Sequence, residues 1–190
     1  MNAIDTGCAV PTGVALHPVT PEEIDEAFVE VFADPAGKNR MMSGTGRSYS
    51  KEDLVAFCRA GLEHSNCFYY RAVGPEGGPP LGVVRIGPID WHNSVSDMSV
   101  VVGNPARRGQ GLGTLLVRLG NAMAFQRHNI RKLHSGILAP NVASVRAYTH
   151  AGWFVEATLQ GQHLLDGKPI DRVVVSCFNP VWQPPASSQP

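Results

Sequence analysis

The sequence lacks the features that would place it among membrane, secreted or nucleic-acid-binding proteins. Its 190 residues contain no apolar run of membrane-spanning length and no basic-then-apolar leader at the start. Sixteen basic residues balance sixteen acidic ones, and a formal net charge of zero argues against a general nucleic-acid binder. We therefore expect a cytoplasmic protein with neither a membrane nor a nucleic acid as its partner.

Cysteine is scarce as well, and its spacing points to no metal. Zinc sites and redox motifs usually contain a CxxC pair, which this chain does not have. We expect reduced thiols and no metal site in a reducing compartment. The four cysteines are Cys8, Cys58, Cys67 and Cys177.

What the chain does contain is enough apolar sequence for one substantial domain. It is 43% hydrophobic and 17% charged, which is typical of a globular protein rather than a disordered one. Residues 1–12 show no periodicity, and residues 180–190 form a polar, proline-rich tail. We expect a flexible N-terminus, one domain over residues 13–179, and a C-terminal tail.

Hydrophobic periodicity and capping signals predict an α/β chain. Short links between the second, third and fourth strands favour an antiparallel meander, and later strands are separated by helices. Residues 34–49 read as a long loop, and residues 160–168 as the connection of a final hairpin. The predicted helices cover residues 22–32, 112–128 and 141–151, with another that starts at a capping box over residues 50–53. The predicted strands cover residues 14–18, 67–73, 81–89, 95–102, 132–137, 153–159 and 170–178.

The most informative stretch is ARRGQGLGTLL, residues 106–116. A Walker A loop is excluded because no lysine follows the glycines, and their GxGxG spacing departs from the GxGxxG of a dinucleotide fingerprint. Glycines at a helix N-terminus can instead form a pyrophosphate cradle, in which backbone N–H groups approach the anion and arginines add charge. The alternative is a glycine-rich turn with solvated arginines, and the glycines alone do not decide between the two.

The surrounding sequence resembles the GNAT family of N-acetyltransferases over residues 14–178. Residues 108–113, RGQGLG, lie between an apolar strand and an apolar helix and match the family's R/Q-x-x-G-x-G/A pattern. Residues 141–154, NVASVRAYTHAGWF, resemble its N-x-x-S/A-x-x-x-Y-x-x-x-G-F segment, with Trp153 where Phe is often seen. The resemblance implies a mixed, largely antiparallel central sheet flanked by helices, whose splayed central strands form a CoA site.

The same resemblance implies acetyl-CoA as co-substrate and assigns residues to it. Amide groups of the glycine loop would hold the pyrophosphate, the strand over residues 98–102 would pair with the pantetheine arm, and Asn141 would bind the pantetheine or the acetyl region. The implied CoA-binding residues are Met98, Val100, Val102, Arg107, Arg108, Gly109, Gln110, Gly111, Leu112, Gly113, Thr114, Asn141 and Ser144.

Amine attack on a thioester needs two proton movements, one from the ammonium and one to the departing thiolate. Tyr148 matches the family's tyrosine that protonates the thiolate, and it lies on one helix face with Asn141; the alternative is a core tyrosine. Two residues are candidates for the base. Asp97 lies near the start of a strand and His92 in the preceding turn, and either would act through a water. The alternative for Asp97 is an exposed charge at a strand end, and the alternative for His92 is a solvated turn residue, neither with a catalytic role.

The sequence does not determine which amine accepts the acetyl group. Residues 161–171 resemble the hairpin of the RimJ/RimL-like branch, whose members acetylate protein N-termini, polyamines or amino-sugar nucleotides. Neutral net charge does not favour a polycation, so we expect a small-molecule amine, with an amino-sugar nucleotide as the specific hypothesis. A protein N-terminal acetyltransferase, a non-catalytic acyl-CoA-binding module and an acyl group other than acetyl stay open, and the family also allows a homodimer. Residues that could meet a phosphate or stack on a base are Arg40, Arg47, Arg85, Tyr69 and Trp91.

Overall fold

The computed structural model describes residues 13–33, 49–103 and 108–184. In this part of the chain one seven-stranded sheet has the order β1-β2-β3-β4-β5-β7-β6. All neighbouring strands are antiparallel except β4 and β5, which run parallel. The predicted sheet and the early meander are confirmed. The strands are β1 (Ala15–Pro18), β2 (Phe68–Val73), β3 (Gly82–Asp90), β4 (Val95–Val102), β5 (Lys132–Leu138), β6 (Phe154–Leu165) and β7 (Lys168–Phe178).

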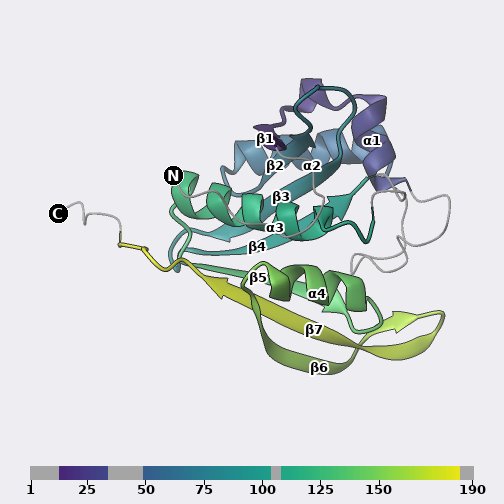
Figure 1. Ribbon diagram of the computed structural model, residues 1–190, viewed down its shortest axis with the longest axis vertical. Helices are drawn as coiled ribbons and strands as arrows, with labels where there is room; N and C mark the ends of the chain where they lie inside the picture. The colour runs from purple at the N-terminus through teal and green to yellow at the C-terminus, as the bar shows by residue number, and fades with distance from the viewer. Residues whose placement is uncertain (1–12, 34–48, 104–107, 185–190) are drawn as a thin grey trace.

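Helices cover both faces of the sheet (Figure 1). α1 (Glu26–Phe32) and α2 (Lys51–Glu63) pack on one face, and their buried side chains form a core with those of β2 and β3. α3 (Leu112–Ala122) and α4 (Val142–His150) pack on the other face over the larger core. No helix in the described ranges is long and apolar enough to span a membrane.

The helix predicted over residues 22–32 is divided in two. A 3-10 turn, Pro21–Glu23, ends where the buried Ile24 takes an extended conformation. Asp25 then starts α1 as a new N-cap, because its side chain accepts a hydrogen bond from the backbone N–H of Phe28. The helix predicted over residues 112–128 changes in a similar way, since α3 passes at Met123–Arg127 into a π-helical segment.

The final hairpin is longer than predicted. Residues 160–168 were expected to connect two strands, but β6 extends to Leu165 and β7 begins at Lys168. Asp166 and Gly167 alone form the turn, with φ of 52° and 75°. Two positive φ values are what a two-residue type I′ turn requires, and Asp-Gly is a favoured sequence for it. The hairpin therefore projects beyond α4 (Figure 1).

Candidate active site

β4 and β5 separate part-way along their length. They pair only through Val95, Ser96 and Asp97, of which Asp97 lies opposite His134. Beyond that point β4 continues to Val102 and β5 to Leu138 without pairing to each other. The splay implied by the sequence is therefore present, and it leaves the β5-facing edge of residues 98–102 without a strand partner.

Tyr148 lies at the point where the strands separate. Its hydroxyl donates a hydrogen bond to the backbone oxygen of Met98 at 3.0 Å, and it also bonds the side chain of Ser135 on β5. Only 3% of Tyr148 is exposed, and its ring packs edge-on against Trp153 at 4.7 Å between centroids. Burial raises the pKa of Tyr148 well above its ordinary value. The phenol is therefore protonated at neutral pH and is suited to donating a proton.

The glycine loop leads directly into α3. Gly111 is the N-cap residue, with φ of 84°, and Gly109 has φ of 78°. Both values lie in the left-handed region that glycine tolerates best. α3 has no side-chain cap and no acidic residue in its first turn, so its first backbone N–H groups are not satisfied by a side chain. A helix N-terminus of this kind favours an anion.

Some of the residues that were predicted to hold CoA lie at this splay, and others lie at the start of α3. Val100, Asn141 and Ser144 line the cleft described below, whereas the Met98 side chain is fully buried and only its backbone faces Tyr148. The Asn141 side-chain oxygen accepts the N–H of Ser144 and so caps α4. Several further members of the predicted set belong to the turn before α3 or to its start: Arg108, Gly109, Gln110, Gly111, Leu112, Gly113 and Thr114.

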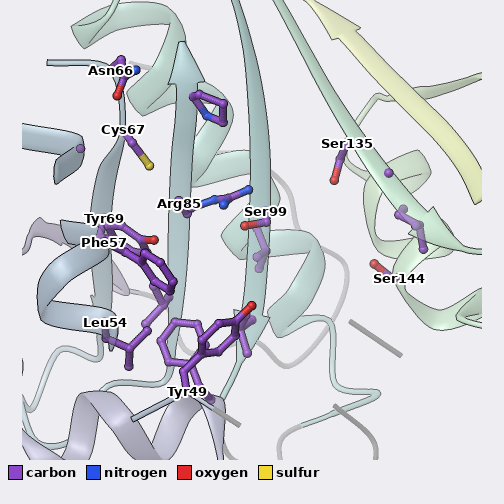
Figure 2. Close-up of a pocket in the computed structure, with 18 of the residues that line it drawn as sticks. Tyr49, Leu54, Phe57, Asn66, Cys67, Tyr69, Arg85, Ser99, Ser135 and Ser144 are labelled. Atoms are coloured by element: carbon purple, nitrogen blue, oxygen red, sulfur yellow. The ribbon is translucent and has the colours of Figure 1, made fainter. Parts of the chain in front are cut away.

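A cleft of about 660 Å³ passes between the separated strands. Figure 2 shows Arg85 and Ser99 on one side of it, and Ser135 and Ser144 on the other. Arg85 lines the cleft, whereas no Asp or Glu is found among the described residues that do so. Burial raises the pKa of Tyr69 to about 12, so this wall residue is also neutral. The apolar end is formed by Phe32, Tyr49, Leu54 and Phe57.

Asp97 forms an ion pair beside the cleft. The Arg85 guanidinium donates to Asp97 Oδ1 at 2.7 Å, and His134 Nδ1 lies 3.9 Å from Asp97 Oδ2. The Asp97 side chain is 17% exposed. Parallel pairing places His134 there, a position that the sequence pattern did not indicate.

The other predicted residues are placed differently. His92 lies in the exposed β3–β4 turn, outside the cleft-lining set, and Trp91 is 48% exposed and donates its indole N–H to the Ser65 backbone. Neither position supports a direct role at the splay. Arg107, Arg40 and Arg47 lie outside the described residues. The cysteines Cys58, Cys67 and Cys177 are free thiols, while Cys8 is also outside the described part.

Comparison with known proteins assigns the family. A family model described as an acetyltransferase (GNAT) domain matches residues 14–153. The chain belongs to the GNAT acetyltransferase family. As in other GNAT enzymes, acetyl-CoA is the co-substrate of this N-acetyltransferase. The RimJ/RimL-like branch stays a prediction.

Solved GNAT structures share the fold. The spermidine N-acetyltransferase from Vibrio cholerae in complex with CoA and spermine has 13% sequence identity and a TM-score of 0.76, covering 88% of this chain and 96% of that one. The spermidine/spermine N-acetyltransferase from Vibrio cholerae in complex with manganese ions has 14% identity and a TM-score of 0.70, covering 88% and 93%. No match was found among curated proteins.

The described residues fit acetyl-CoA. Uncapped N–H groups at the start of α3, together with Arg108, suit a pyrophosphate, and the unpaired edge of β4 suits the amide groups of a pantetheine arm. When bound, acetyl-CoA supplies an activated acetyl thioester.

Proposed function

We propose that this GNAT enzyme transfers an acetyl group from acetyl-CoA to the primary amine of a small molecule, by direct attack of the amine on the thioester. The observation that carries the proposal is the buried Tyr148 hydroxyl at the opening of β4 and β5, beside a cleft that reaches both faces of the sheet.

Tyr148 is the proposed proton donor. Its hydrogen bond to Met98 holds the hydroxyl at the splay, and a departing thiolate is a stronger acceptor than a backbone carbonyl. Because burial raises its pKa, Tyr148 keeps its proton until that acceptor is formed.

Asp97 is the proposed base, acting through a water. The ion pair with Arg85 holds the carboxylate in place, and His134 lies on its other side. His92, the other candidate from the sequence, lies on the exposed turn, and we assign it no role.

An amino-sugar nucleotide is the proposed class of acceptor. Tyr49 and Phe57 form an edge-to-face aromatic pair at 5.9 Å at the apolar end of the cleft, which provides a surface for a base. A polyamine would be favoured by carboxylates, and the described cleft wall has none. This acceptor differs from those in the names of the structural neighbours.

Free-thiol release from acetyl-CoA tests the proposal. The acceptors are amino-sugar nucleotides, polyamines, aminoglycosides and peptides with free N-termini. Release with amino-sugar nucleotides, together with the acetylated product in a mass spectrum, is the expected result. Release with polyamines or peptides alone would refute the acceptor class but keep the transferase.

A further inference from the structure

An arginine occupies the space that a side chain at Gly136 would fill. A Cβ built on Gly136 would overlap Nε, Cζ and Nη2 of Arg172, which comes from β7. Gly136 lines the cleft. The glycine on β5 therefore allows the guanidinium of Arg172 to lie directly against the strand that forms one wall of the cleft.

This guanidinium lies on the same face of the sheet as Asp97. On β5, Leu133 and Ile137 are buried in the core under α3 and α4, so Gly136 and His134 face the opposite side. His134 is the residue opposite Asp97. Ser135, which bonds the Tyr148 hydroxyl, is the residue before Gly136 and points to the opposite face, so Arg172 lies against the cleft wall on the Asp97 side.

Arg172 has no counter-charge among the described residues. Its Nε is buried without a hydrogen-bond partner, and neither an ion pair nor a hydrogen bond joins its guanidinium to any described residue. Its neighbour Asp171 points away along the alternation of the strand and accepts the backbone N–H of Gly161. A buried donor without a partner is costly, unless a ligand satisfies it.

Two other cations on this face are neutralised. Arg85 is paired with Asp97, and Lys132 is paired with Glu156. Arg172 differs from these two cations, because no described acidic residue pairs with its guanidinium. A planar guanidinium binds carboxylates and phosphates through two parallel N–H donors.

We infer that Arg172, lying over Gly136, is a specificity-determining residue that binds an anionic group of the acceptor, a carboxylate or a phosphate carried by the same molecule as the reactive amine. This inference rests on the proposed acetyl transfer and adds the acceptor's charge to it. A polycationic acceptor would require a negative charge at this position, whereas Arg172 supplies a positive one.

Pairs of acceptors that differ only in the anion test the inference. Phenylalanine against phenylalaninamide tests a carboxylate, glucosamine 6-phosphate against glucosamine tests a phosphate, and spermidine represents a polycation. The kcat/KM of each is measured by thiol release for wild type, Arg172→Gln and Gly136→Ala. Gly136→Ala keeps the charge but displaces the guanidinium, a flexible group that can move at little cost.

The wild type is expected to prefer one charged member over its uncharged partner by about tenfold or more, as for a charge-assisted hydrogen bond. Both variants should lose that preference through the KM of the acceptor, while the KM of acetyl-CoA is unchanged. The control Arg59→Gln removes an exposed arginine on α2 and should keep the preference. Equal use of both members by the wild type, a preference for spermidine, or an equal loss for charged and uncharged acceptors in Arg172→Gln would overturn the inference.

Calorimetry on the CoA-loaded protein separates this inference from the proposed function. Tighter binding of a charged acceptor that depends on Arg172 would support the anion site even if no thiol were released, and only the proposed transfer would then fail. Equal binding of the charged and uncharged members would refute the anion site, whether or not thiol is released.

Discussion

The Tyr148 hydroxyl donates a hydrogen bond to the backbone oxygen of Met98, the first β4 residue beyond the last β4–β5 pair. It also bonds Ser135 on β5, so one phenol connects the two strands where their ladder ends. We therefore propose that Tyr148, at the end of the β4–β5 ladder, is the side chain that meets a thioester bound between the strands.

Replacing Tyr148 by Phe should reduce kcat by about 100-fold or more, the usual contribution of a general acid. The ring would still pack on Trp153, so the KM for acetyl-CoA should change little. Steady-state kinetics measure both quantities. The control is Tyr70→Phe, which removes a buried hydroxyl bonded to His128 and away from the cleft, and should keep kcat. Equal kcat in Tyr148→Phe and wild type would exclude Tyr148 as the acid.

Gly109→Ala should weaken CoA binding by about tenfold, about 1.4 kcal/mol. Gly109 and Gly77 have φ of 78° and 74°, and a Cβ at either position meets nothing within 4 Å. Each alanine should therefore cost a similar 1–2 kcal/mol of backbone strain, roughly. Only the methyl at Gly109 would occupy space beside the start of α3. Calorimetric titration with CoA compares Gly109→Ala with the control Gly77→Ala. Equal CoA affinities of the two variants would contradict the pyrophosphate cradle.

Asp97→Asn should lower kcat/KM by about 100-fold, because an amide cannot accept the proton of the ammonium. Activity should recover partly as pH rises, since more of the acceptor is then a free amine. The pH–rate profile is the measurement, with Asp90→Asn at the exposed end of β3 as control. If Asp97 served only to hold Arg85, the loss would appear in the acceptor's KM and the shape of the profile would not change.

The stabilisation that Glu156 contributes to the folded protein should be lost in acid. The Lys132 ammonium and the Ser176 hydroxyl hold the pKa of Glu156 below its ordinary value of 4.5. Because this pKa is lower in the folded chain, the stabilisation is present above pH 4.5 and is lost as pH falls through the folded pKa. Urea unfolding of wild type and Glu156→Gln over a pH series should show a difference that narrows in acid. A difference independent of pH would argue against the ion pair.

The sequence predicted most of the fold because its signals are local. The capping box at Ser50 and Asp53 is present, and Asn141 caps α4. The break at Ile24 was missed because an isoleucine at helical spacing does not reveal that Asp25 restarts the helix. The Asp166–Gly167 turn did have a sequence signal, the Asp-Gly pair, and the longer strands follow from it.

The site was predictable only where a motif covers it. Tyr148, Asn141 and the glycine loop belong to family motifs, whereas strand register brings His134 beside Asp97 and Arg172 beside Gly136. Parallel pairing sets His134 opposite Asp97, and the bare backbone of Gly136 admits Arg172. Local periodicity does not show which distant strands pair, so the positions of His134 and Arg172 could not be inferred from sequence spacing.

The most direct test of the account is acetyl transfer itself, measured as free thiol released from acetyl-CoA together with acetylated acceptor, in wild type and Tyr148→Phe. The account predicts equal amounts of thiol and acetylated amine in the wild type, and loss of both in the variant while CoA still binds. Acetylated amine formed at the wild-type rate by Tyr148→Phe, or a wild type that does not bind CoA, would contradict it.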